Sequence, residues 1–190
     1  MAKMLKDTLK TIEFYKNQNP HYEELLAILE EILILREEYR RRLTADVFPV
    51  DERLIPSKIE GGLPLIDMSQ GDYDLTQSRD YFLDLLHIAE KRAPGETQEL
   101  ARKIRDGEED FRELVLGAFY GEPGEVEEEE QDNEEETFDL IDLFLEECLR
   151  PAFERVAAKY GESVLKAKWS EGYCPICGKE PKIGEIKEEE

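Results

Sequence analysis

The chain has 190 residues, with 25 Lys and Arg against 47 Asp and Glu, which gives a formal net charge of −22. With 40% hydrophobic residues it can bury a core as one domain, which excludes wholesale disorder, and it contains no apolar run long enough to span a membrane. Because nucleic acids and anionic membranes attract basic surfaces, the acidic balance also argues against both as partners.

Apolar residues in the first half predict two helices and a long connector. The first helix is expected to end before Asn19-Pro20, and a second amphipathic pattern runs over 21–45 with three arginines in its last turn. Segment 47–74 is rich in proline and glycine, and it is predicted to be an irregular connector that wraps around the helices. Its apolar residues predict that it is partly buried: Leu63, Leu65, Ile66 and Met68.

Helical periodicity returns at Thr76 and predicts helices over 76–93, 96–106 and 108–120. Segment 121–136 contains ten acidic residues and no basic ones, which indicates a solvated acidic linker. A further apolar pattern starts at residue 137 and meets Pro151, where the helix either kinks or a new helix begins. A short helix over 162–169 is expected to follow. The sequence therefore predicts an all-α fold, with a helical domain over 1–170.

The cysteine segment is the most informative part of the sequence. It reads Cys174-Pro175-Ile176-Cys177-Gly178. Proline restricts φ inside such a turn, and glycine adopts the positive φ that closes it, so the two thiolates are held on one rigid knuckle. Two thiolates are half of a tetrahedral four-sulfur site for zinc or iron. We therefore identify Cys174 and Cys177 as candidate metal ligands.

Two other interpretations of this Cys-x-x-Cys segment remain open. A thiol redox pair needs the first cysteine at the N-terminus of a helix, and Gly178 and Pro181 argue against a helix there. A structural pair without any ligand is the second alternative, and it does not explain the proline and the glycine. Thiol redox chemistry would require a depressed thiol pKa, which the flanking residues do not indicate.

A closed structural site needs four ligands, and the remaining candidates fit poorly. Cys148 lies on the apolar face of a predicted helix and is expected to be a small buried hydrophobe. His21 and His87 are isolated and are expected at the surface or at helix ends. The second half of the site must then be missing or come from another chain. One hypothesis is a homodimer in which two chains pool their cysteine pairs.

Several of these features occur together in a known family. Trp169 lies shortly before the Cys174–Gly178 turn, Pro181 and Gly184 follow it, and Gly62-Leu63-Pro64-Leu65-Ile66 lies upstream of the third predicted helix. In this combination the chain resembles the formate dehydrogenase accessory proteins of the FdhE type. The resemblance implies a helical domain followed by a rubredoxin-like or zinc-ribbon-like region. Here that region is the partial knuckle segment 171–190, because the family's further Cys-x-x-Cys pairs do not follow.

The resemblance implies an assembly role rather than catalysis. Proteins of this family are cytoplasmic, are not enzymes, and bind the catalytic subunit of a respiratory formate dehydrogenase before its export. By the same resemblance the cofactor is zinc or iron, bound incompletely or absent here because two of four ligands are missing. The residues agree in that they show no nucleophile–base pair and no phosphate-binding glycine loop.

We expect the client to contact segments 47–74 and 150–184, since conformationally specified loops on a helical scaffold tend to carry function. The alternative is a metal-knuckle interaction or regulatory module unrelated to formate dehydrogenase. A thiol redox protein that uses Cys174 and Cys177 is the third hypothesis.

Overall fold

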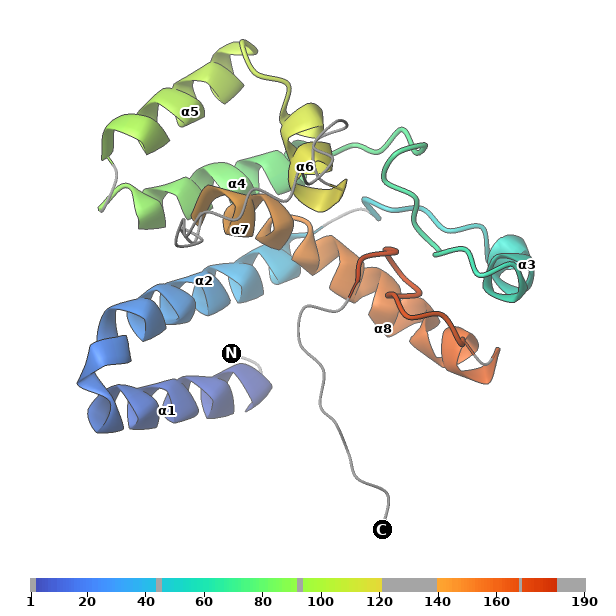
Figure 1. Ribbon diagram of the computed structural model, residues 1–190, viewed down its shortest axis with the longest axis horizontal. Helices are drawn as coiled ribbons and strands as arrows, with labels where there is room; N and C mark the ends of the chain where they lie inside the picture. The colour runs from blue at the N-terminus through green and yellow to red at the C-terminus, as the bar shows by residue number, and fades with distance from the viewer. Residues whose placement is uncertain (1–2, 44–45, 92–93, 121–139, 168, 181–190) are drawn as a thin grey trace, which may run out of the picture.

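The structure of the chain is a computed structural model, and it describes residues 3–43, 46–91, 94–120, 140–167 and 169–180 (Figure 1). Within these ranges all regular structure is helical and no strand occurs, which agrees with the expected all-α class. The acidic segment 121–136, together with Pro181 and Gly184, lies outside the described residues. The elements in chain order are α1 (Lys3–Gln18), η1 (Pro20–Tyr22), α2 (Glu23–Arg42), η2 (Glu52–Leu54), α3 (Ile55–Glu60), α4 (Thr76–Ala89), α5 (Pro94–Asp106), α6 (Phe111–Tyr120), α7 (Leu140–Glu147) and α8 (Arg150–Lys166).

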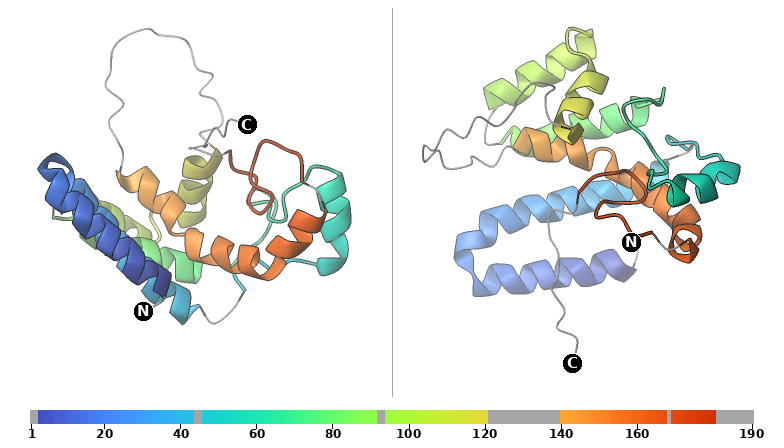
Figure 2. Two further views of the ribbon diagram at one scale, coloured as in Figure 1. Left: turned by 90° about the horizontal axis from the view of Figure 1, so that it is seen from below. Right: turned by 45° about the vertical axis from the view of Figure 1, so that its right-hand side comes forward.

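The first two helices form an antiparallel hairpin (Figures 1 and 2). The 3₁₀ turn η1 reverses the chain at Pro20, whose fixed φ suits the first position of a helical turn. The predicted helix over 21–45 is confirmed as α2, with Arg40, Arg41 and Arg42 in its last turn. Arg40 and Arg41 bind the carboxylate of Glu37, and Arg42 pairs with Glu38, so two carboxylates partly neutralise the basic cluster.

The core lies where α4 and α7 cross α2 and the start of α8. Phe82 and Leu85 of α4, Phe144 of α7 and Leu149 are fully buried there. The rings of Tyr39 and Tyr81 stack at a centroid distance of 4.5 Å and join α2 to α4. Burial of large apolar side chains is the main stabilising contribution, so this crossing holds the fold together.

The connector over 47–74 is more ordered than predicted. It contains the short elements η2 and α3, which proline and glycine content had concealed. Its expected burial is confirmed for Leu65, Ile66 and Met68, which are at most 3% exposed. The expectation was wrong for Leu63, which is 57% exposed because it lies at the turn that follows α3.

The structure decides between the two alternatives at Pro151, because α7 ends at Glu147 and a new helix, α8, begins with Pro151 in its first turn. The predicted separate helix over 162–169 was wrong, since α8 continues through Gly161 to Lys166. A glycine inside a helix costs only about 1 kcal/mol relative to alanine, which tertiary packing of the flanking Tyr160 and Val164 outweighs.

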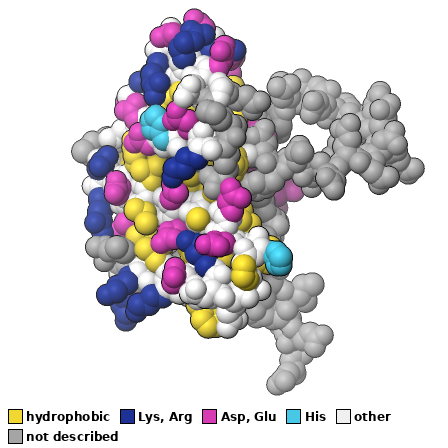
Figure 3. All heavy atoms as spheres, turned by 90° about the vertical axis from the view of Figure 1, so that its left-hand side faces the viewer, with side chains coloured by type: hydrophobic (Ala, Val, Ile, Leu, Met, Phe, Trp, Pro, Cys, Tyr) yellow, Lys and Arg dark blue, Asp and Glu magenta, His cyan; other side chains and the backbone are white. Residues whose placement is uncertain are grey.

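Acidic and basic side chains alternate on the face built by α1, the first half of α2 and α5 (Figure 3). Apolar side chains are visible between them. None of the described helices is both long enough and apolar enough to cross a bilayer.

Candidate functional site

The cysteine segment forms a tight turn beside α8. The N–H of Gly178 donates to the carbonyl of Cys174 at 2.8 Å, and the N–H of Cys174 donates to the carbonyl of Lys179 at 2.9 Å. Gly178 has φ +77°, a left-handed conformation that a side chain disfavours. An added Cβ would also lie 3.1 Å from Cγ of Pro64, so glycine is required here on two counts.

Both sulfurs of the turn accept hydrogen bonds, and Cys174 accepts more of them than Cys177. The Cys177 thiol and the backbone N–H groups of Cys177 and Ile176 donate to Cys174, and together they lower the pKa of the Cys174 thiol to about 5 against the opposing effect of burial. The Cys177 thiol donates its proton to Cys174, and this hydrogen bond, together with burial, raises the pKa of Cys177. The N–H of Lys179 donates to the Cys177 sulfur and opposes the increase. Donors directed at the Cys174 sulfur stabilise its thiolate, the protonation state that a metal ligand needs, whereas Cys177 holds its proton in the metal-free turn and would have to release it on binding a metal.

The turn docks on the connector. The N–H of Leu65 donates to the carbonyl of Pro175 at 2.9 Å, and that of Ile66 donates to the carbonyl of Ile176 at 2.8 Å. The hydroxyl of Tyr173 donates to the carbonyl of Gly62, which lies 111 positions away in the sequence. The two stretches that carry the family resemblance, 62–66 and 174–178, are therefore in direct contact.

Trp169 positions the entry into the turn. Its indole Nε1–H donates to the carbonyl of Tyr173 at 2.8 Å, and the two rings meet edge-to-face at 5.3 Å. At the exit, the ammonium of Lys179 pairs with the carboxylate of Glu146 on α7 and lies 4.8 Å from the centroid of the Phe119 ring. The turn is thus attached to the connector on one side and to α6 and α7 on the other.

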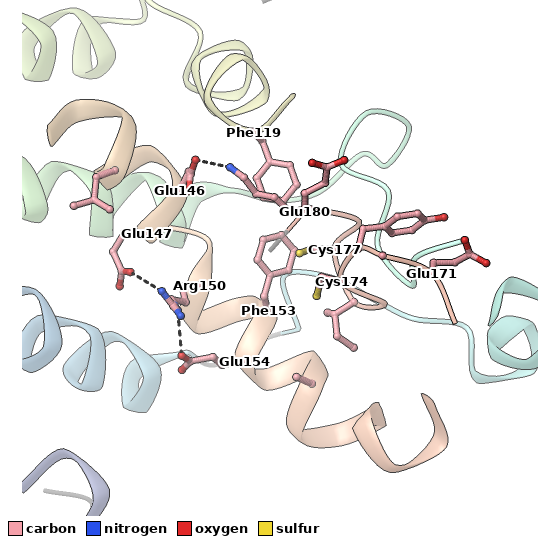
Figure 4. Close-up of a pocket in the computed structure, with 16 residues that line it drawn as sticks. Phe119, Glu146, Glu147, Arg150, Phe153, Glu154, Glu171, Cys174, Cys177 and Glu180 are labelled. Atoms are coloured by element: carbon pink, nitrogen blue, oxygen red, sulfur yellow. Dashed lines mark hydrogen bonds and ion pairs between the residues drawn. The ribbon is translucent and has the colours of Figure 1, made fainter. Parts of the chain in front are cut away.

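A cleft of about 580 Å³ separates the turn from α7 and α8 (Figure 4). Cys174 and Cys177 are half-buried in its wall, and Phe153 of α8 faces them across it. The cleft belongs to the size class of small-molecule and peptide pockets. Its lining includes Phe119, Leu143, Glu146, Glu147, Arg150, Phe153, Glu154, Ala157, Glu171, Gly172, Tyr173, Cys174, Ile176, Cys177, Lys179 and Glu180.

The other candidate ligands lie elsewhere. Cys148 is 2% exposed, donates to the carbonyl of Leu145 at 3.0 Å, and has its pKa raised by burial, so it is the buried hydrophobe that its position predicted. His21 and His87 are exposed, and Nδ1 of His87 lies 3.1 Å from a carboxylate oxygen of Glu90. Among the described residues no group of three or more His, Cys, Asp or Glu side chains is placed to hold a metal ion.

The donor set therefore fits half of a tetrahedral metal site. Two cysteines of the right type are held on one turn with their sulfurs accepting backbone hydrogen bonds, as thiolate ligands require. The described residues supply no third ligand beside them.

Sequence reasoning missed a buried charge pair at the edge of the cleft. Glu147 is 5% exposed, and its carboxylate accepts two hydrogen bonds from Arg36 of α2, at 2.5 and 2.7 Å, and one from the hydroxyl of Tyr81 at 3.1 Å. Burial alone would lower the pKa of Arg36, but the hydrogen bonds and charge of Glu147 raise it. The one sequence signal for this pair was Arg36 itself, because it occupies a position of the α2 pattern that otherwise holds apolar residues.

The chain is similar along nearly its whole length to one curated protein. It is 24% identical over 186 residues to the protein called FdhE homolog from Aquifex aeolicus (strain VF5), a match that covers 96% of this chain. The match covers 59% of the relative, so the chain spans about three fifths of that protein's length. No family model and no solved structure matches the chain. The similarity to an FdhE homolog extends well beyond the short cysteine turn.

Proposed function

We propose that this protein is an accessory factor that binds the catalytic subunit of a formate dehydrogenase during its maturation and is not itself an enzyme. The observation that carries the proposal is the near-full-length similarity to an FdhE homolog. The contact between residues 62–66 and the cysteine turn supports it. Both stretches contribute to the family resemblance, and in the fold they form one surface.

Affinity capture tests this proposal. The tagged 190-residue chain, handled without oxygen, is expected to retain the catalytic subunit of the formate dehydrogenase encoded by the same genome. The subunit of an unrelated molybdenum-containing oxidoreductase serves as the negative control for capture. Equal recovery of the two subunits, or recovery of neither, would contradict the proposal.

A matched pair of surface variants tests where the client binds. Leu63 and Met4 are apolar and exposed, at 57% and 81%, but only Leu63 belongs to the expected contact segment 47–74. Burying a leucine side chain at an interface contributes about 1.5–3 kcal/mol, so Leu63→Ser is expected to weaken capture by roughly tenfold or more. Met4→Ser should leave the capture unchanged.

We further propose that Cys174 and Cys177 bind zinc or iron as two of its four ligands. When bound, the ion supplies a structural cross-link. The remaining ligands would come from outside the described residues, and a second copy of the chain that contributes its own pair is one source. The support is the donor geometry: two half-buried sulfurs on one turn, each accepting backbone N–H groups.

The low pKa of Cys174 favours a second candidate function, thiol–disulfide exchange. In that reaction the Cys174 thiolate attacks a substrate disulfide and expels one thiolate. Cys177, losing its proton, then displaces the second thiolate and leaves a Cys174–Cys177 disulfide. Against this candidate, the residues after Cys174 form a turn rather than the helix whose dipole redox cysteines use, and the described residues contain no preceding strand.

Alkylation by iodoacetamide separates the two candidates. In the metal-free protein, Cys174 is expected to keep most of its plateau rate at pH 6, since its pKa is about 5. An ordinary thiol with a pKa of about 8.5 would be below about 1% ionised there. Because the folded pKa of Cys174 is depressed, its ionisation contributes stability that is lost as the pH falls through about 5, while the raised pKa of Cys177 offsets that contribution above the ordinary thiol pKa.

Repeating the alkylation with added zinc distinguishes metal binding from thiol–disulfide exchange. If the turn binds metal, zinc should slow alkylation of Cys174 and Cys177 together by at least about tenfold. Buried Cys148 should react only after unfolding, with or without zinc. Conversion of oxidised glutathione to two reduced molecules per chain, without any effect of zinc, would instead establish the exchange reaction and contradict the metal proposal.

A further inference from the structure

The cleft beside the cysteine turn has an apolar floor. Phe119 of α6, Phe153 and Ala157 of α8, and Ile176 of the turn contribute to it. Ala157 is exposed there, whereas Phe153 is anchored beneath by stacking on Phe48 at a centroid distance of 4.6 Å. An apolar surface of this kind, inside a cleft of about 580 Å³, can bury side chains of a bound segment.

Carboxylates surround this floor and outnumber the cations. Five glutamates line the cleft against two cations, Arg150 and Lys179. Lys179 is already paired with Glu146. Arg150 lies 3.7 Å from Glu154 and 3.9 Å from Glu147.

The two glutamates at the mouth of the cleft carry the excess charge. Glu171 and Glu180 belong to the lining on either side of the cysteine turn and both are exposed, with the carboxylate of Glu171 beside Gly62 of the connector (Figure 4). Neither has an ion-pair partner among the described residues. The mouth of the cleft is therefore negative, while its floor is apolar.

We propose that this cleft binds a short segment of a partner protein in which apolar side chains lie next to lysine or arginine. The apolar side chains would cover the floor between Phe153 and Ile176, and the cations would lie against Glu171 and Glu180. This inference rests on the proposed function in one respect: the partner that carries the segment is then the client. An acidic or purely polar segment fits neither the floor nor the mouth.

The protein contains its own reporter for this binding. Trp169 is the single tryptophan of the chain, and its indole is hydrogen-bonded to Tyr173, a residue of the cleft wall. A segment that enters the cleft changes the surroundings of Tyr173 and hence the emission of Trp169. A peptide without tryptophan can therefore be titrated into the full-length protein without any label.

The experiment compares three synthetic peptides in reducing, metal-free buffer. The first has a Leu-Phe-Leu centre flanked by two lysines on each side, the second has glutamates in place of the lysines, and the third has serines in place of the apolar centre. We expect saturable quenching or a spectral shift with the first peptide. The second and third peptides should bind at least about tenfold more weakly, because each lacks one of the two complementary features.

Two pairs of variants assign the binding to this cleft. Combined Glu171→Lys and Glu180→Lys should weaken binding of the first peptide by about fivefold or more, whereas Glu162→Lys, a reversal at an 88% exposed position of α8 outside the cleft, should not. Ala157→Gln puts a polar side chain on the floor and should also weaken binding. Ala158→Gln, at the adjacent exposed position outside the lining, is its control.

The proposal is overturned if Trp169 emission shows no saturable change up to about 1 mM of the first peptide. It is equally overturned if the glutamate peptide binds as tightly, or if Glu162→Lys weakens binding as much as the paired reversal, since the attraction would then reflect only the charge of the whole chain. These outcomes do not affect capture of the formate dehydrogenase subunit, which is measured separately and can occur through other surfaces.

Discussion

Replacing Arg36 with methionine is expected to lower the free energy of unfolding by about 3–5 kcal/mol, the range observed when one partner of a buried ion pair is removed. The reason is the location of Glu147, which is 5% exposed and loses its two strongest hydrogen bonds in this variant. The hydroxyl of Tyr81 carries no charge, and Arg150 lies 3.9 Å from the carboxylate, beyond hydrogen-bond distance, so neither replaces Arg36. Urea denaturation followed by circular dichroism measures the change.

A double-mutant cycle shows whether the loss comes from the stranded carboxylate. Arg36→Met combined with Glu147→Met should recover much of the stability, because no unpaired charge remains buried. Arg53→Met is the surface control: its pair with Asp51 is 88% exposed at the arginine, so the change should stay within about 0.5 kcal/mol. A double variant as unstable as Arg36→Met alone would show that packing of the arginine stem, rather than charge, is the cause.

Ile66→Ala is expected to lower the free energy of unfolding by about 2–5 kcal/mol, as large-to-small substitutions in a packed core do. Ile66 is 1% exposed and lies in the core cluster although it belongs to the irregular connector. Its N–H also holds the carbonyl of Ile176, so the cavity would open beside the cysteine turn. The measurements are urea denaturation and the emission of Trp169, which should shift in the folded variant.

Leu63→Ala is the matched control in the same segment. Leu63 is 57% exposed, so its truncation should change stability by no more than about 0.5 kcal/mol and leave Trp169 emission unaltered. Equal effects of the two substitutions would mean that the connector is a surface loop and not part of the core.

Periodic apolar residues predicted the long helices well. The end of α1, both ends of α2, the start of α4 and the end of α6 fall close to the predicted ones, since an amphipathic stripe and a proline or glycine stop are local signals; α4 ends and α6 begins about one turn away from the prediction. The same rules failed at α3 and at Gly161. A six-residue helix offers too few turns for a pattern, and the penalty of one glycine is smaller than the packing of the helix around it.

The candidate site was predictable in part. Cys174 and Cys177 are recognisable because proline and glycine at fixed positions shape the turn locally. The cleft, the contact with residues 62–66 and the Glu147–Arg36 pair were not predictable, since each joins segments far apart in the sequence. A glutamate on a helix gives no local sign that an arginine 111 positions earlier will neutralise it.

The sequence by itself determined the helical class, the acidic character and the position of the two thiols, because composition and short-range spacing act within a few residues. Only the tertiary structure decided which apolar residues of the connector enter the core, that α8 is one continuous helix, and that the cysteine turn closes one wall of an acidic, apolar-floored cleft. These features depend on how the hydrophobic faces of distant helices pack together. That packing is set by the whole chain at once rather than by any one segment.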